Sequence, residues 1–412
     1  MKECTKNFAI VGVMVLFFGV AFLFPFNCFG IEEVKVGIIF PVTGPIAKTG
    51  ITYFKACEYA VDKINSTGGI KSLGGAKIKL LKADSQASNE IGMSETERLI
   101  GEGVVAILGA YQSGVTYPCS QIAERNKVPW LVTGAIADEL TERGLKYTFR
   151  AHPKTSYYAK DLYEFLEAMR KTRGLTIKTA GLLYENTLYG QSVAKNQKEF
   201  APKYGFQIVV DIPYPHGTSD VSAEITKLKA AKPDVVFQSS YIGDAILITK
   251  KMKELNLNTM GIIASGAAHH QPEFIRDLGP LSEYFYVVCG WNSGLKIPGQ
   301  KEIVEDFEKR YQEPMKEDGA IAISTMNILK DALERAASSD RQKVREALAK
   351  TKLSSGEKGV ILPYNIEFGP NGENIHEKVI IDQILGGVRT TVFPPQIAVK
   401  NPVFPIPKWE QR

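Results

Sequence analysis

Residues 104–116 read VVAILGAYQSGVT, and this stretch is the strongest indication of the fold. The run 104–108 is unbroken in apolar residues, which is typical of a strand buried on both faces of a parallel sheet. Gly109 then allows a tight turn, and Ser113 is a good N-cap for a helix predicted over 113–125. In open α/β folds such a strand-to-helix junction binds ligands, and its free N–H groups favour an anion. The stretch therefore predicts a carboxylate site at Ser113, with simple helix capping as the alternative.

The same rhythm of strand and helix extends along most of the chain. Short apolar runs alternate with amphipathic stretches from Val34 to Thr133, and the pattern restarts after His152 and continues to about residue 290. Strand, helix and strand in repetition indicate a parallel sheet with right-handed crossovers. Two such α/β units of similar size predict two lobes with a cleft between them.

The remaining third of the chain has a different pattern. Residues 291–349 are predicted to be mostly helical, and short strands are expected between residues 359 and 384. The tail from Phe393 is rich in proline, which favours an extended segment lying on the surface. Its prolines are Pro394, Pro395, Pro402, Pro405 and Pro407.

Composition narrows the class of protein. The chain has 412 residues, 44% of them hydrophobic and 23% charged, with a formal net charge of +5, which fits a soluble globular protein. No dense basic stripe with interleaved aromatic residues is present, so nucleic acid is not expected as a partner. The widely spaced Cys57, Cys119 and Cys289 form no disulfide or metal pattern, and buried free thiols are expected.

The first thirty residues resemble a secretory signal peptide. Lys2 and Lys6 precede an apolar run over 9–26, and small Gly30 precedes the expected cleavage site. Residues 1–30 are therefore predicted to direct export to the periplasm. An uncleaved membrane anchor and a lipid-modified Cys28 are the two alternatives, because the apolar run is long for a signal peptide.

Catalytic signatures are absent from the sequence. It contains no Gly-rich dinucleotide or phosphate loop, no HExxH and no GxSxG motif, so no enzyme activity and no cofactor are predicted. The adjacent His269 and His270 have no clustered acid or cysteine nearby in sequence, and no metal site is expected. An exposed loop is the simpler interpretation for them, with His270 lining a cleft as the alternative.

Small residues and tyrosines recur at the predicted strand ends. Small residues let a ligand approach the backbone, and tyrosines supply apolar area and a hydroxyl group. The candidate ligand-binding residues are Tyr111, Ser113, Ala135, Ile136, Ala137, Tyr189, Tyr241, Ser265 and His270.

Several stretches, taken in order, resemble the periplasmic binding proteins of ABC importers, in the leucine/isoleucine/valine-binding group. They are VKVGIIFPVTGPIAKTG (34–50), AVDKINSTGGI (60–70), ILGAYQSGVTYPCSQIAERNKVPWLVTGA (107–135), LTERGLKYTFR (140–150), LYGQSVA (188–194) and TSDVSAEITKLKAAKPDVVFQSSY (218–241). The resemblance implies the type I periplasmic binding fold, in which two Rossmann-like lobes with parallel sheets are joined by a three-strand hinge. On that fold we expect residues 31–152 and 290–362 in the first lobe, 153–289 and 363–393 in the second, and 394–412 as the tail.

The resemblance also implies a function. Proteins of this group trap a ligand between closing lobes and deliver it to a membrane permease and its ATPase subunits, without chemistry on the ligand. The group's carboxylate-binding serine matches Ser113, its ligand tyrosines match Tyr189 and Tyr241, and Ala135 lies in the segment that runs along the ligand. A small carboxylate, most simply a branched-chain or apolar amino acid, is therefore the expected ligand.

The sequence departs from the group's pattern at three places, two of which concern the ammonium end of the ligand. The group's ammonium-binding threonine is replaced by Ile136 or Ala137, and its ammonium-binding glutamate aligns with Ser265, although Glu273 is near. The wall aromatic usual after TGPxA is replaced by Thr49. A buried ammonium without an acidic partner is costly, so either another acid serves or the ligand is an aromatic or aliphatic carboxylate or amide without an ammonium. A sensor that presents its ligand to a membrane receptor is a further alternative to transport.

Overall fold

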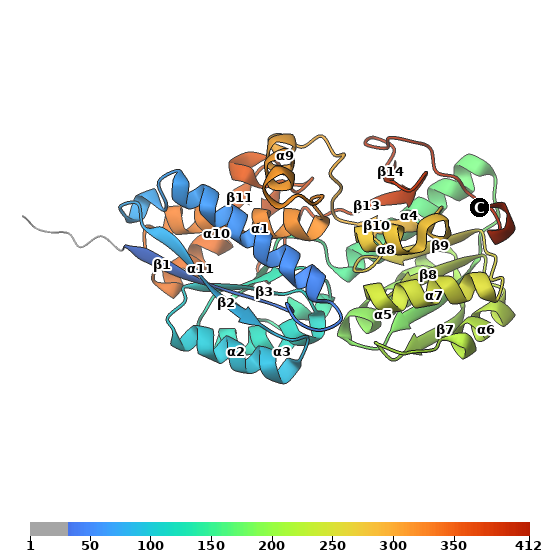
Figure 1. Cartoon of the computed structure of the whole chain (residues 1–412), viewed down its shortest axis with the longest axis horizontal. Coiled ribbons are helices and arrows are strands. Elements are labelled where there is room, and N and C mark those ends of the chain that lie inside the picture. Colours follow the sequence, from blue (N-terminus) through green and yellow to red (C-terminus); the bar gives the residue numbers. More distant parts are fainter. Residues whose placement is uncertain (1–31) are drawn as a thin grey trace, which may run out of the picture.

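The computed structural model describes residues 32–412, which form two α/β lobes side by side (Figure 1). The predicted signal peptide, the membrane anchor and Cys28 lie outside the described residues. Within residues 32–412, no helix is both long and apolar enough to cross a membrane. Cys57, Cys119 and Cys289 are buried free thiols, which confirms the expectation for them.

The first sheet has five parallel strands in the order β2-β1-β3-β4-β5. These are β1 (Glu33–Phe40), β2 (Lys77–Asp84), β3 (Ala106–Ala110), β4 (Trp130–Thr133) and β5 (Thr148–Arg150). The chain leaves β1 toward one edge and returns to build β3 on the other side. The strand order therefore reverses between β1 and β3, where open α/β sheets form a ligand crevice at their carboxyl ends.

The second sheet repeats this plan and extends it. Its order is β14-β13-β10-β9-β8-β6-β7. Its five parallel strands, read as β7-β6-β8-β9-β10, follow the same order as β2-β1-β3-β4-β5 in the first sheet. β13 pairs antiparallel with both β10 and β14. The strands are β6 (Thr179–Glu185), β7 (Gln207–Tyr214), β8 (Val235–Ser239), β9 (Gly261–Ser265), β10 (Tyr286–Cys289), β13 (Ile380–Ile384) and β14 (Arg389–Phe393). The predicted α/β fold of two lobes with parallel sheets is confirmed.

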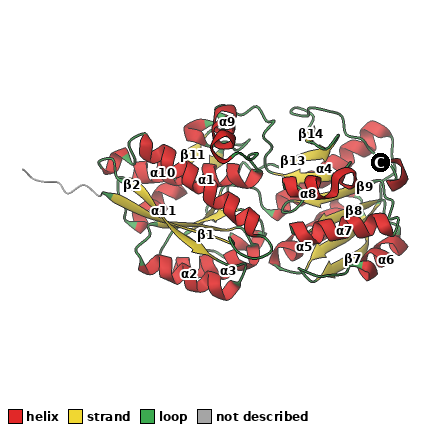
Figure 2. Cartoon of the chain, in the orientation of Figure 1, coloured by secondary structure: helices red, strands yellow, loops and turns green. Residues whose placement is uncertain are grey.

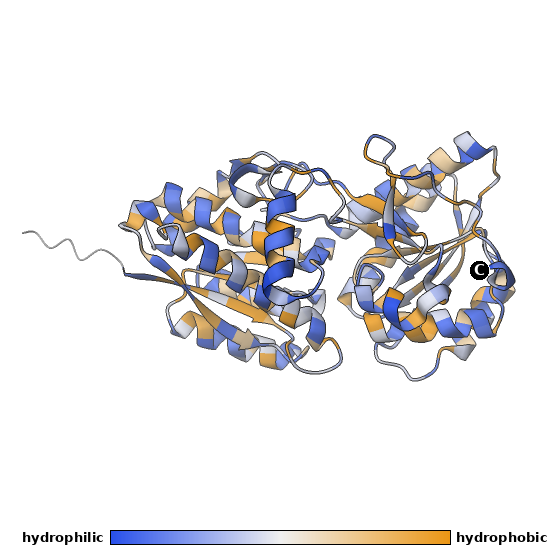
Figure 3. Ribbon diagram, turned by 45° about the horizontal axis from the view of Figure 1, so that its top comes forward, coloured by the Kyte–Doolittle hydropathy of each residue, from blue (hydrophilic) through white to orange (hydrophobic). Residues whose placement is uncertain are grey.

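Helices cover both faces of each sheet (Figure 2). Their apolar residues recur on one side, so Figure 3 shows individual helices in both colours, as expected for helices with one buried face. Those of the first lobe are α1 (Ala47–Ser66), α2 (Asn89–Gly101), α3 (Ser113–Arg125), α9 (Gln300–Tyr311), α10 (Glu317–Ala336) and α11 (Arg341–Ala349). Those of the second are α4 (Thr155–Arg173), α5 (Leu188–Phe200), α6 (Ser222–Ala231), α7 (Ile242–Glu254) and α8 (Pro272–Leu278). The long helices α1 and α10 pack against each other on one face of the first sheet.

The chain passes between the lobes three times, after β5, after β10 and before β13. Before the third passage, β12 (Ile366–Glu367) pairs with β11 (Lys352–Leu353), beside the helices of the first lobe. Glu373 forms a bridge with Arg150 at the end of β5. Arg150 is fully buried and holds Glu373 with a hydrogen bond of 2.9 Å from Nε to Oε1. This buried ion pair ties two of the three connecting segments together.

The C-terminal tail corrects one prediction from the sequence. Phe404, Ile406 and Trp409 are buried, so the expectation that the tail lies on the surface is wrong for these residues. The hydroxyl of Tyr286 donates to the carbonyl oxygen of Val403 at 2.8 Å, and the amide of Ile406 donates to Met260 at 3.0 Å. The tail thus covers apolar surface of the second lobe, which the proline content of the segment did not indicate.

Candidate functional site

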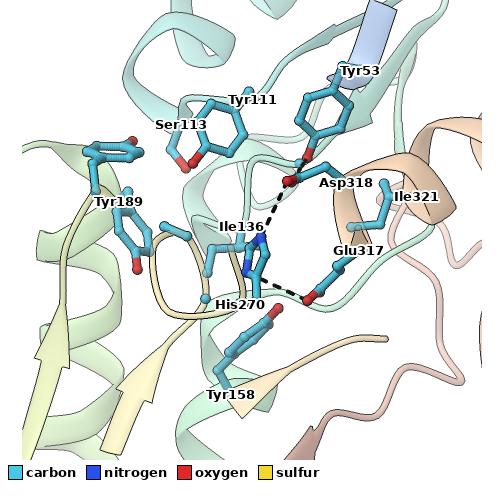
Figure 4. A pocket seen from close by; sticks show the side chains of 14 residues that line it. Tyr53, Tyr111, Ser113, Ile136, Tyr158, Tyr189, His270, Glu317, Asp318 and Ile321 are labelled. Carbon is cyan, nitrogen blue, oxygen red and sulfur yellow. Dashed lines mark hydrogen bonds and ion pairs between the residues drawn. The ribbon is translucent and has the colours of Figure 1, made fainter. Parts of the chain in front are cut away.

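A pocket lies between the two lobes, at the carboxyl ends of both sheets (Figure 4). Residues from both lobes enclose it: Tyr53, Tyr111, Ser113, Gly134, Ile136, Tyr158, Tyr189, Tyr241, Gly266, Ala267, His270, Glu317, Asp318 and Ile321. The cavity has a volume of about 30 Å³, which is room for about two waters. A molecule larger than these waters therefore enters only when the surrounding elements move apart.

Residues 104–116, the stretch that predicted a carboxylate site, form one wall of this pocket. The strand β3 continues to Ala110, and the backbone turns at Tyr111, whose φ is +68°. The prediction that the turn lies at Gly109 is therefore wrong. Gly109 is required for a different reason, because a Cβ there would lie 2.5 Å from the carbonyl oxygen of Ile39 on the neighbouring strand β1.

Ser113 is the first residue of α3, and Gln112 occupies the N-cap position that the sequence assigned to Ser113. The Ser113 side chain does not cap its own helix. Its Oγ accepts a hydrogen bond of 3.3 Å from the backbone amide of Ala137, and the residue is 1% exposed. A hydroxyl at the N-terminus of a helix can donate to an anion while the helix dipole favours the negative charge. The geometry suits a carboxylate.

Six of the nine candidate residues line the pocket: Tyr111, Ser113, Ile136, Tyr189, Tyr241 and His270. The other three do not line the pocket but form hydrogen bonds through their backbones. Ala137 donates to Ser113, the carbonyl oxygen of Ala135 accepts from Arg150, and the carbonyl oxygen of Ser265 accepts from the Tyr189 hydroxyl.

Tyrosines from both lobes contact one another around the pocket. The ring of Tyr241 lies 5.5 Å from that of Tyr189 and 5.9 Å from that of Tyr111, measured between centroids. Burial is the main cause that raises the pKa of Tyr241 well above its ordinary value, so its hydroxyl stays neutral. Because Tyr111 belongs to the first lobe and Tyr241 to the second, this contact closes the cleft between them.

An aromatic wall residue also exists on α1, although Thr49 stands where the family resemblance places one. Tyr53 lies one helical turn after Thr49, on the same face of the helix, and lines the pocket. Its ring stacks on Phe40 of β1 at a centroid distance of 4.5 Å. Because Tyr53 also fits the apolar pattern of an ordinary buried helix face, nothing in the local pattern singles it out.

Two acidic residues also line the pocket, and neither was predicted from the sequence. Glu317 and Asp318 are the first two residues of α10, and they are 2% and 1% exposed. Burial raises the pKa of Glu317 above its ordinary value. Burial acts in the same direction on Asp318, but His270 together with hydrogen bonds from Gln271 and Tyr53 holds its pKa below the usual range. Acids in the first turn of a helix are common, so sequence alone offered no signal here.

The exposed-loop interpretation of the histidine pair is wrong, because both side chains are buried. His270 lines the pocket, with Nε2 at 3.4 Å from Asp318 Oδ2 and Nδ1 at 3.7 Å from Glu317 Oε2 (Figure 4). His269 packs against the ring of Phe274 at a centroid distance of 4.4 Å, and burial lowers its pKa to about 3. The acidic partners that the sequence lacked around His270 come from α10, which lies far along the chain.

Polar contacts link the lobes around the pocket. The Nζ of Lys316 lies 3.3 Å from Glu273 Oε1, and both side chains are largely buried. The hydroxyl of Ser192 donates to Glu139 Oε2 at 2.7 Å, and Lys195 pairs with the same acid at 3.1 Å. Glu273, the acid noted from the sequence, is therefore neutralised by Lys316 and does not line the pocket.

Two lobes built on the same sheet order, with a pocket enclosed between them, define a two-lobed ligand-binding protein. The chain belongs to the periplasmic binding protein family, whose sequence model matches residues 33–380. This places the chain in a family of solute-binding proteins, which the resemblance anticipated.

Individual relatives agree with this assignment. A Leu/Ile/Val-binding protein homolog from Brucella abortus is 29% identical over 381 residues, covering 90% of this chain and 93% of the relative. Two solved structures share the fold. The branched-chain amino acid transporter substrate-binding protein LivJ from Streptococcus pneumoniae, in complex with isoleucine, has a TM-score of 0.76 at 22% identity and covers 87% of this chain and 98% of its own. A solute-binding protein of an ABC transporter from R. palustris, in complex with benzoate, has a TM-score of 0.74 at 19% identity. The match covers 87% of this chain and 95% of that structure's chain.

Proposed function

We propose that the protein is an extracytoplasmic solute receptor that binds a small carboxylate between its two lobes and delivers it to an ABC importer. An amino acid with a branched-chain or apolar side chain is the preferred ligand. The observation that carries the proposal is the pocket itself. In it, Ser113 at the start of α3 faces a space that Tyr189 and Tyr241 enclose from the other lobe.

The proposed binding mode follows from these residues. The ligand carboxylate accepts hydrogen bonds from the Ser113 hydroxyl and from backbone N–H groups at the start of α3. The apolar part of the ligand packs on the tyrosine rings and on Ile136. Ala137 and Ser265 support Ser113 and Tyr189 through the hydrogen bonds described above.

Lobe closure is the second part of the proposal. We assign residues 32–152 and 290–374 to the first lobe, in place of the boundary after residue 362 expected from the sequence, since β12 pairs with β11 and Glu373 binds Arg150. Residues 153–289 and 375–393 form the second lobe, with the tail 394–412 packed on it. A ligand shifts the balance from open to closed only if it contacts the closed form differently, and a pocket lined from both lobes meets this condition.

The relatives support the ligand class. They include a Leu/Ile/Val-binding homolog and a neighbour holding isoleucine. A carboxylate without an ammonium is the second candidate ligand, supported by the benzoate-bound neighbour. Export to the periplasm and delivery to permease and ATPase subunits follow from the same relationship and from the predicted signal peptide.

A thermal-shift screen followed by isothermal titration calorimetry tests the proposal. Leucine, isoleucine, valine, benzoate and other small acids are added to the exported form of the protein, and at least one is expected to raise the melting temperature. Ser113→Ala is expected to reduce that shift at the same ligand concentration. Stimulation of the ATPase activity of a reconstituted cognate importer by the loaded receptor then separates transport from sensing. A protein that responds to no small carboxylate contradicts the proposal.

A further inference from the structure

The charges in the pocket are unbalanced. Two carboxylates, Glu317 and Asp318, reach it from α10, and among the described residues that line the pocket His270 is the one side chain able to carry a positive charge. Even a protonated imidazole supplies one positive charge against two carboxylates. The buried guanidinium of Arg389 also attracts both acids, but it does not line the pocket and is itself paired with Asp382 at 3.8 Å. Burying an ionised carboxylate without a partner is costly, so a cation in this space would be stabilised.

The two acids differ in how their oxygens are satisfied. Both oxygens of Asp318 accept short hydrogen bonds, Oδ1 from the Tyr53 hydroxyl at 2.8 Å and Oδ2 from the Gln271 amide at 2.6 Å. In Glu317, Oε1 accepts from the backbone amide of Gly290 at 2.7 Å. Glu317 Oε2 is buried and accepts no hydrogen bond from any residue in 32–412.

The nearest candidate donor for Glu317 Oε2 does not satisfy it. His270 Nδ1 lies 3.7 Å away, beyond hydrogen-bond distance, and this nitrogen also has no partner within the described residues. An unmade hydrogen bond to a buried carboxylate oxygen carries a large desolvation penalty. The site is therefore built to receive a donor group from a molecule in the pocket.

We propose that Glu317, supported by Asp318, binds a primary ammonium of the ligand, so that the ligand class is an amine-bearing carboxylate. This inference rests on the proposed function, because Ser113 must hold the carboxylate of the same molecule. An ammonium has three donors and no acceptor, which matches the free Glu317 oxygen and the excess negative charge. The second lobe has no acid where the resemblance places one, at Ser265, and α10 of the first lobe supplies it instead.

This arrangement assigns the lobes different tasks. Ser113 on α3 and Glu317 on α10 both belong to the first lobe, so both charged ends of the ligand dock on one lobe. The second lobe contributes mainly tyrosines and the backbone around Gly266, which cover the ligand when the cleft closes. A ligand with one charged end would leave Glu317 Oε2 unpaired and would bind more weakly.

Matched pairs of probes test this inference by titration calorimetry. Each amino acid is compared with the deaminated acid of the same carbon skeleton: leucine with isocaproate, and γ-aminobutyrate with butyrate. The second pair places the ammonium at the far end of the chain. For the pair that fits the pocket, we expect the amine-bearing member to bind at least about 30-fold more tightly, since an unpaired buried charge is costly.

Glu317→Gln is the decisive variant because it keeps the size of the side chain and removes its charge. It is expected to weaken binding of the amino acid by about 30-fold or more and to leave the deaminated acid nearly unchanged, so that the preference between them disappears. The matched control is Glu273→Gln, which removes an inter-lobe acid outside the pocket. It is expected to weaken both members of a pair by one common factor.

The outcomes separate the inference from the proposed function. Deaminated acids that bind wild-type protein as tightly as their amino acids overturn the ammonium site and leave a carboxylate receptor. An unchanged preference in Glu317→Gln does the same. If the variant does not fold, the wild-type preference decides alone. Absence of binding by every carboxylate tested overturns the proposed function and the inference with it.

Discussion

The hydroxyl of Tyr53 donates a 2.8 Å hydrogen bond to Asp318 Oδ1, although the two residues stand 265 positions apart in the sequence. Tyr53 belongs to α1 and Asp318 to the first turn of α10, and these helices pack against each other beside the first sheet. The bond orients one of the two acids of the pocket. It also contributes to lowering the pKa of Asp318, because the phenol donates to the ionised form.

Tyr53→Phe is expected to lower the free energy of unfolding by about 1–2 kcal/mol, because a buried carboxylate loses a donor. Chemical denaturation at neutral pH measures this change. Tyr59→Phe is the matched control on the same helix. The Tyr59 hydroxyl bonds to Asp306 at 2.9 Å, but the side chain of Asp306 is 43% exposed, so water replaces the lost bond and the cost is smaller. Equal losses in the two variants would show that the Asp318 bond has no special role.

Ser113→Ala is expected to weaken binding of every carboxylate by about tenfold to a hundredfold, since one hydrogen bond to a charged group is lost. Titration calorimetry with the best ligand of the screen measures the effect. Ser120→Ala, also buried on α3, removes a hydroxyl that donates to the carbonyl of Thr116 and does not line the pocket. Binding is expected to survive in Ser120→Ala, and a loss there as large as in Ser113→Ala would refute the assignment.

Glu273→Gln is expected to raise the dissociation constant for all ligands by about threefold to tenfold, because the largely buried pair with Lys316 links the lobes. Small-angle X-ray scattering of the ligand-free protein should then show a larger radius of gyration. Lys195→Met removes the exposed pair with Glu139, whose side chains are 59% and 28% exposed, and should change little. A Glu273→Gln protein with unchanged affinity and size would mean that the pair does not stabilise closure.

Stability is expected to fall with acidification because of two buried histidines. Burial lowers the pKa of His152 and of His269 to about 3. Below about pH 6.5 the unfolded chain binds protons at these rings and the folded protein does not, so the free energy of unfolding decreases by up to about 1.4 kcal/mol per pH unit for each histidine. The loss continues until the folded protein also binds these protons, near pH 3.

Urea denaturation between neutral pH and about pH 5 measures this slope. His269→Phe should reduce this dependence on pH, because a phenyl ring does not titrate. The phenyl ring can still pack against Phe274 and Phe285 as the imidazole does. His376→Gln is the control, since that side chain is 41% exposed. A slope that His269→Phe leaves unchanged would contradict the prediction.

Local pattern accounts for much of what could be predicted. The alternation of strands and helices, the strand β3 and the helix α3 all follow from runs of apolar residues and their spacing, which neighbouring residues along the chain determine. The ends of some helices and strands differ by a few residues from those predicted. The turn after β3 lies at Tyr111, and Gly109 is needed for close approach to β1, which no local pattern reveals.

The sequence by itself determined the two-lobed α/β fold, and it pointed to the strand-to-helix junction at Ser113 as the carboxylate side of the proposed site. The tertiary structure alone decided where the acids lie. Glu317 and Asp318 look like ordinary first-turn helix residues, and His270 looks like a loop histidine, until the packing of α10 against α1 and the approach of the second lobe bury them together. The physical reason is that burial and charge balance depend on contacts between residues distant in sequence, whereas strand and helix patterns depend on near neighbours.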